Sequence, residues 1–217
     1  MRKAGSMVGS GFPMFRTRVF TETLEIAKLL GGLPSARSAL FEIGIPQSLL
    51  GGRYTAYTEP SVLPRDGHPP VVCFGSSGPF VTIGIDTENG NVVYVLDVPE
   101  KPVNLVNATA ILFTQTVQAL IGRFPYHAKD AENQELDAVS AELREIIRSI
   151  DPEAAVLGRY WPSFVDDVQM GDFNTEDILA WERRSNSLDG PVSRLSDGCP
   201  AQRFVLLGSP ECYAMLH

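Results

Sequence analysis

The segment FVTIGIDTENGNVVYVLDV, residues 80–98, decides the fold class of this chain. It contains two runs rich in β-branched and aromatic residues, 80–86 and 92–98, with a polar loop between them. Asn89-Gly90 in such a loop favours a type I′ turn, because both residues tolerate positive φ angles. We therefore predict an antiparallel hairpin here.

Shorter elements surround this hairpin. The apolar runs 71–74 and 103–107 are predicted to be two further strands. Upstream, apolar spacing followed by glycine predicts one helix over 24–30 and a second over 35–42. Residues 51–70 are rich in Gly, Pro and Tyr, and we expect an irregular connection there.

Helices are predicted after the strands. Asn107 is a candidate N-cap for a helix that ends at Gly122. Residues 132–150 form the most amphipathic segment, with glutamates largely outside an apolar stripe. That stripe consists of Leu136, Val139, Leu143, Ile146, Ile147 and Ile150. Asp151-Pro152 and Trp161-Pro162 each resemble a cap followed by a first-turn proline.

Three aromatic residues close to Pro162 form a cluster in the sequence: Tyr160, Trp161 and Phe164. Core packing is favoured for them over an exposed binding site, because large aromatic side chains are mostly buried. For the whole chain we expect a flexible basic leader at 1–20, one domain at 21–184 and a weakly structured appendage at 185–217.

The charge is unevenly distributed. The formal net charge is −8, but residues 21–180 alone carry ten Lys/Arg against twenty-two Asp/Glu. Such a body repels phosphate backbones, which disfavours nucleic-acid binding and favours a basic partner. The simpler alternative is that the acidity only maintains solubility.

Cysteine usage and hydropathy suggest a compartment. Three cysteines, Cys73, Cys199 and Cys212, do not make a disulfide framework. No apolar run is long enough to cross a bilayer, and we recognise no secretory signal. We therefore expect a cytoplasmic protein that does not associate with membranes.

No arrangement of residues that would support catalysis is recognised. The histidines His68, His127 and His217 lack metal-ligand spacing, and no phosphate-binding glycine loop is present. The stretch 74–78, FGSSG, resembles a nucleophile motif, but a strand follows it where that motif needs a helix. We predict no catalytic residue, no metal site and no cofactor.

Several stretches, taken in order, resemble the SUKH superfamily of bacterial immunity proteins, specifically the actinobacterial group usually placed as its fourth subfamily. The matching stretches are 41–46, 74–75 with 83–86, 89–94, 106–109 with Phe113, and 151–154 with Tyr160, Trp161 and Phe164. Ala108 departs from the family pattern, which has a serine after the asparagine. The resemblance spans roughly residues 24–170.

This resemblance implies an α+β domain with a twisted antiparallel sheet and flanking helices. It also implies that the chain neutralises a co-encoded protein toxin, often a nuclease or nucleic-acid deaminase, by direct binding. An acidic surface would suit a basic active-site cleft. The candidate partner-binding residues are Glu132, Glu135, Glu142, Glu145, Asp166 and Asp167.

Two alternatives stay open. The first is a regulatory or scaffold protein of the same fold that binds an endogenous partner. The second is an enzyme or small-molecule binder with a pocket under the turn at 75–79, a region with few titratable groups.

Overall fold

The computed structural model describes residues 14–98 and 102–188. The strands are β1 Thr17–Arg18, β2 Ile45–Pro46, β3 Ser48–Leu49, β4 Tyr54–Arg65, β5 His68–Ser76, β6 Val81–Asp86, β7 Val92–Leu96 and β8 Val103–Asn107. The α-helices are α1 Leu24–Leu29, α2 Pro34–Ser38, α3 Ala110–Arg123, α4 Asn133–Ile150, α5 Tyr160–Gln169 and α6 Thr175–Leu188. A π-helical turn, Ala39–Ile43, and a 3-10 turn, Leu50–Gly52, complete the elements described.

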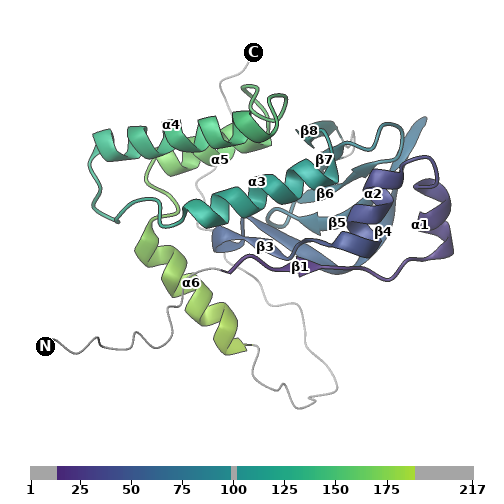
Figure 1. Cartoon of the computed structure of the whole chain (residues 1–217), viewed down its shortest axis with the longest axis horizontal. Coiled ribbons are helices and arrows are strands. Elements are labelled where there is room, and N and C mark those ends of the chain that lie inside the picture. Colours follow the sequence, from purple (N-terminus) through teal and green to yellow (C-terminus); the bar gives the residue numbers. More distant parts are fainter. Residues whose placement is uncertain (1–13, 99–101, 189–217) are drawn as a thin grey trace, which may run out of the picture.

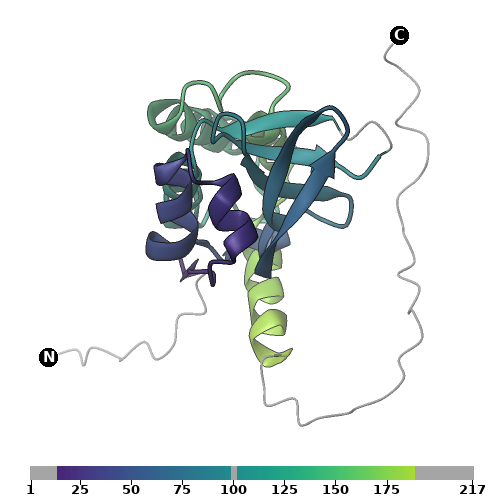
Figure 2. The same cartoon turned by 90° about the vertical axis from the view of Figure 1, so that its right-hand side faces the viewer.

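The predicted fold class, α+β with a twisted antiparallel sheet and flanking helices, is confirmed. Strands β3 to β8 form one sheet in chain order, with every neighbouring pair antiparallel. The sheet curls strongly (Figure 2). In Figure 1, α3 lies against the sheet, α4 and α5 run side by side, and α6 projects away from the sheet. No helix in the described part of the chain is long and apolar enough to span a membrane.

The predicted hairpin is formed by β6 and β7, but its turn is not type I′. Gly90 has a positive φ of 82°, whereas Asn89 does not. Instead, the Asn89 side chain accepts a hydrogen bond from the Asn91 amide at 2.9 Å, and Asp86 accepts one from the Glu88 amide at 2.9 Å. These local side-chain bonds stabilise a longer loop, so the two-residue turn is not needed.

The expected irregular connection over 51–70 was wrong, because most of it forms the hairpin of β4 and β5. Strand β4 pairs with β3 through Tyr54 and Thr55, and the Ala56 amide donates to the Gln47 carbonyl at 2.8 Å. Beyond these residues no strand in the described ranges pairs with that edge. Pro60 and Pro64 are therefore tolerated, since no partner strand needs their missing N–H groups. The register shifts between Ala56 and Ser61, as expected at such irregular positions.

The curled sheet buries apolar side chains on both faces. Val72 and Phe74 of β5 belong to the main core under the helices, whereas Val71 and Cys73 belong to a second, smaller cluster. Successive residues of a strand point to opposite faces. This explains why the run at 71–74 is continuously apolar. Trp161 and Phe164 are fully buried in the main core, so the prediction that the aromatic cluster packs inside is confirmed.

Three predicted helix starts need correction. Trp161 is not a cap, because α5 begins at Tyr160 with Arg159 as its N-cap. Helix α3 is capped by Thr109, whose hydroxyl accepts a hydrogen bond from the Leu112 amide at 3.1 Å, and not by Asn107. It also ends one residue beyond Gly122. Asp151 begins no helix: it follows the last turn of α4, and the next helix, α5, starts only at Tyr160.

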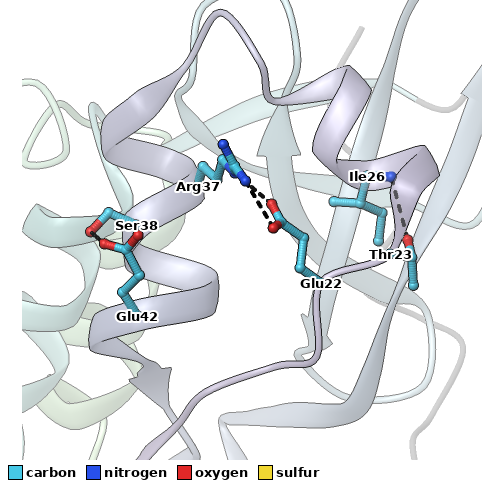
Figure 3. Close-up of polar contacts among 6 residues, drawn as sticks. All are labelled: Glu22, Thr23, Ile26, Arg37, Ser38 and Glu42. Carbon is cyan, nitrogen blue, oxygen red and sulfur yellow. Dashed lines mark hydrogen bonds and ion pairs between the residues drawn. The ribbon is translucent and has the colours of Figure 1, made fainter.

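The helices near the N-terminal side are tied together by polar contacts (Figure 3). Thr23 caps α1 by accepting a hydrogen bond from the Ile26 amide at 3.4 Å. Arg37 of α2 donates to Glu22 through two nitrogens, Nη2 reaching Oε2 at 2.9 Å. This hydrogen-bonded guanidinium holds the pKa of Glu22 below its ordinary value.

The proposed domain boundaries stay a prediction. Residues 1–13 and 189–217 lie outside the described ranges. Within the ranges described, β1 lies inside the expected leader and pairs with β2, while α6 continues past residue 184 to Leu188.

Candidate functional site

Helix α4 is amphipathic, and all four predicted glutamates lie on its exposed side. The helix buries Leu136, Val139, Leu143 and Ile147 of the predicted stripe, whereas Ile146 and Ile150 are half-buried. The exposed glutamates are Glu132, Glu135, Glu142 and Glu145. Because residues three and four apart share a helix face, apolar spacing alone was sufficient to predict this exposure.

The four glutamates differ in their partners. Glu142 forms an ion pair with Arg123 of α3 at 2.7 Å, and Glu145 forms one with Arg148 at 2.7 Å. Glu132 and Glu135 have no ion-pair partner among the described residues. Of the four glutamates, Glu132 and Glu135 are therefore the two that no Arg or Lys of the described ranges neutralises.

Asp166 and Asp167 of α5 face different partners. Asp166 pairs with Arg144 of α4 at 2.9 Å, whereas Asp167 accepts a hydrogen bond from Arg53 Nη1 at 2.8 Å. Burial raises the pKa of Asp167 above its ordinary value, and Arg53 opposes this rise only in part. The two carboxylates therefore do not act as one site, as their 100° separation on a helix requires.

A polar ladder joins α4 to α5. Arg144 Nη2 also donates to Gln169 Oε1 at 2.7 Å, and Gln169 Nε2 donates to Asp137 Oδ1 at 2.6 Å. Because Asp166 pairs with the same Arg144, it also helps to hold α5 against α4. Sequence reasoning missed Asp137 and these pairings, because the partners come from two helices whose relative position the pattern does not give.

The start of α6 adds acids near the N-terminus of α4. Glu176 accepts a hydrogen bond from the backbone amide of Lys129 at 3.0 Å, and Asp177 pairs with the Lys129 ammonium at 3.3 Å. Residues 130–177 contain thirteen Asp/Glu but only three Arg and no Lys. Most of the acidic excess of the chain therefore lies in the layer built by α4, α5 and the first turn of α6.

A family model, SUKH-4 immunity protein, matches residues 6–167. The chain belongs to this family. A search of curated proteins and a search of solved structures found no match. Membership in SUKH-4 indicates a role in toxin immunity, and it implies a protein toxin as the partner. Helix α6 follows the matched region.

Some of the residues that carried the SUKH resemblance meet in one buried network. Asn107 Nδ2 donates to Asp151 Oδ2 at 2.9 Å, and Asn107 Oδ1 accepts from Trp161 Nε1 at 2.8 Å. Asp151 also accepts from the backbone amides of Ala108 at 2.8 Å and Ala154 at 3.3 Å. These residues join β8, α4 and α5 in the interior, so we assign them to fold stability and not to partner contact.

The described residues contain no group of three or more His, Cys, Asp and Glu placed to hold a metal ion. His127 is buried, with its ring nitrogens 2.9 Å and 3.0 Å from the carbonyl oxygens of Ala128 and Asp172. It joins the segment before α4 to the segment before α6, which is a structural role.

Proposed function

We propose that this SUKH-4 protein neutralises its toxin by covering a basic surface of that toxin with the exposed acids of α4. The basic surface would be the substrate cleft of a nuclease or a nucleic-acid deaminase, because such clefts bind polyanions. The immunity protein would then occupy the cleft by imitating the charge of the substrate. No catalytic step by the immunity protein is involved.

The observation that carries the proposal is the pair Glu132 and Glu135 at the N-terminus of α4. Both side chains are exposed, and neither has an internal ion-pair partner among the described residues. Exposed carboxylates can exchange water for a partner's Lys or Arg without first breaking an internal bond. Charges of opposite sign across an interface mainly accelerate association.

Glu142 and Glu145 would contribute less than Glu132 and Glu135. Each already forms an internal ion pair at 2.7 Å. Such exposed pairs stabilise a protein by only about 0–1 kcal/mol, so a toxin arginine could displace the internal base. Asp166 and Asp167 are more firmly held, because Arg144 and Arg53 join them to other elements.

The test is association kinetics with the toxin encoded beside this gene, measured at several sodium chloride concentrations. We expect the on-rate to fall steeply as salt rises. Replacing Glu132 and Glu135 together by Gln should lower the on-rate at low salt about tenfold and change the off-rate less. The matched control replaces Glu59 and Glu88, two exposed acids on the strand side, by Gln.

Several outcomes would contradict the proposal at different levels. If the on-rate is independent of salt, charge imitation is wrong even where binding persists. If the on-rates of the two double variants fall by the same factor, only the net charge matters and α4 is not the contact surface. If the neighbouring gene encodes no protein that binds, an endogenous partner and a regulatory role become the better explanation.

A further inference from the structure

A polar cavity of about 440 Å³ lies where the N-terminus of α5 meets the sheet. Its walls include Arg53 beside β4, Ser77 after β5, Tyr94 of β7, and Arg159 and Tyr160 at the start of α5. Two arginine residues therefore line one small space. Neither the α4 surface nor the proposed toxin contact uses this space.

Both arginines have a buried nitrogen without a hydrogen-bond partner. Arg53 Nε and Arg159 Nη1 are two of the three buried side-chain polar atoms in the described residues that have no partner. A buried, unpaired N–H of a charged group is costly, and native proteins rarely keep one without a reason. Both residues line the cavity, so a bound acceptor could pair with other donors of the same two guanidinium groups.

The Arg53 side chain is held in place before any ligand binds. Its Nη1 donates to Asp167 at 2.8 Å, and its guanidinium carbon lies 5.4 Å from the ring centre of Tyr160 and 5.9 Å from that of Phe164. The Tyr160 hydroxyl donates to the Arg53 carbonyl at 3.1 Å and lies 3.2 Å from the Ser77 hydroxyl. Little side-chain freedom is left to lose on binding.

The local charge suits an anion although the surrounding layer is acidic. Asp166 also lines the cavity, but Arg144 pairs with it at 2.9 Å, and Asp167 pairs with Arg53. Among the residues that line the cavity, two arginines accompany one aspartate. Arg159 forms no ion pair with any of the described residues, so its charge is not neutralised inside the protein.

We propose that this cavity is a binding site for an oxyanion, a phosphate or a carboxylate, held by Arg159 and Arg53. Planar guanidinium groups match the oxygen geometry of both groups. The hydroxyls of Ser77 and Ser163 line the same space and can donate to a third oxygen. The oxyanion belongs either to a free phosphate compound or to a carboxylate of a bound protein.

The test uses the full chain alone, so its result does not depend on the toxin. Inorganic phosphate and, separately, acetate are titrated at constant ionic strength while the amide resonances of residues 158–161 and 163 and the arginine Nε resonances are followed by NMR. We expect saturable shifts confined to the cavity. Tighter binding of phosphate by about tenfold assigns the site to a phosphate compound, and comparable or tighter binding of acetate assigns it to a protein carboxylate.

The deciding variant is Arg159→Gln, with Arg148→Gln as its control. Arg148 is an exposed arginine of α4 that pairs with Glu145 and does not line this cavity. Arg159→Gln should weaken anion binding about tenfold or more without lowering the thermal midpoint, whereas Arg148→Gln should leave binding unchanged. Titrations without saturation for both anions, or equal binding by the two variants, would overturn the proposal.

Discussion

At the scale of single residues, Asp151 has the most demanding position in the molecule. It is 2% exposed, yet its carboxylate accepts hydrogen bonds from Asn107, from the Ala108 amide and from the Ala154 amide. A buried carboxylate is tolerated only where donors surround it. Through Asn107 the network continues to the Trp161 indole, so one acid organises the contact of β8, α4 and α5.

Replacing Asp151 by Ala should therefore be severe. The buried Ala108 amide would lose its acceptor, while the Ala154 amide keeps the Asp151 carbonyl at 3.1 Å and Asn107 Nδ2 keeps Thr116 Oγ1 at 3.4 Å. We expect the free energy of unfolding to fall by about 2–3 kcal/mol. Urea denaturation measures this, with Glu153→Ala as an exposed control two residues away. An equal decrease in the free energy of unfolding for the two variants would show that the network adds nothing to stability.

The role of Asp151 illustrates what sequence can and cannot predict for a residue. The pair Asp151-Pro152 predicts a helix start, because Asp is a common N-cap and Pro is common in the first turn of a helix. Two of the partners of Asp151, Ala108 and Asn107, are 43 and 44 positions away. A local pattern carries no information about them. The ordered family motifs included these residues without revealing that they touch.

At the scale of elements, α6 is docked through a pair of glycines. Gly51 and Gly52 have positive φ angles of 61° and 74°. A Cβ on Gly51 would lie 2.9 Å from Ile178 Cδ1, and one on Gly52 would lie 3.2 Å from Trp181 Cζ2. The absence of side chains in this turn lets α6 lie directly against the backbone of the 3-10 turn.

We predict that Gly51→Ala loosens α6. The change adds the strain of a positive φ and a contact with Ile178, together about 2–3 kcal/mol of unfolding free energy. Gly67→Ala is the matched control, because Gly67 has a φ of 70° but nothing within 4 Å of an added Cβ. Hydrogen exchange of the α6 amides should accelerate in Gly51→Ala only. Equal exchange in both variants would mean that α6 does not depend on this contact.

Elements with a clear period were predicted well, and those set by distant contacts were not. The stripe of α4 and the hairpin of β6 and β7 follow from periodicity and composition. Strand β4 was missed because its prolines and the glycines on either side of it outweighed its Tyr, Thr and Val content, while the lack of a partner strand beside those prolines in the described residues made them harmless. The exposure of the α4 glutamates could be predicted, whereas their pairing with Arg123 could not.

At the scale of the whole molecule, charge and fold are arranged in layers. The sheet and the helices packed on it share the core, while residues 130–177 carry thirteen acids against three arginines. The cavity at the start of α5 is a local exception within this acidic layer, because Arg53 and Arg159 line it. The proposed oxyanion site and the proposed toxin surface therefore need partners of opposite charge, which allows each to be measured without the other.

Repulsion within the acidic layer leads to a prediction about the isolated protein. Raising sodium chloride from low to physiological concentration should increase the thermal midpoint, because screening weakens the repulsion among exposed acids. Replacing Glu132 and Glu135 together by Gln removes two of these charges. The double variant should start with a higher midpoint at low salt, by about 0.5–1 kcal/mol in unfolding free energy, and should gain less from added salt.

Glu22→Gln is the control for this salt series, and its expected effect has the opposite sign. Glu22 pairs with Arg37, so its loss removes an attraction that is strongest at low salt. Chloride is used and phosphate avoided, since an anion in the α5 cavity would itself stabilise the fold. If the midpoint of the unaltered chain instead falls as salt rises, internal pairs such as Arg123 with Glu142 outweigh the repulsion. The charges of the exposed acids would then be neutralised by bases of the same chain. The proposed acceleration of toxin association by these acids would lose its physical basis.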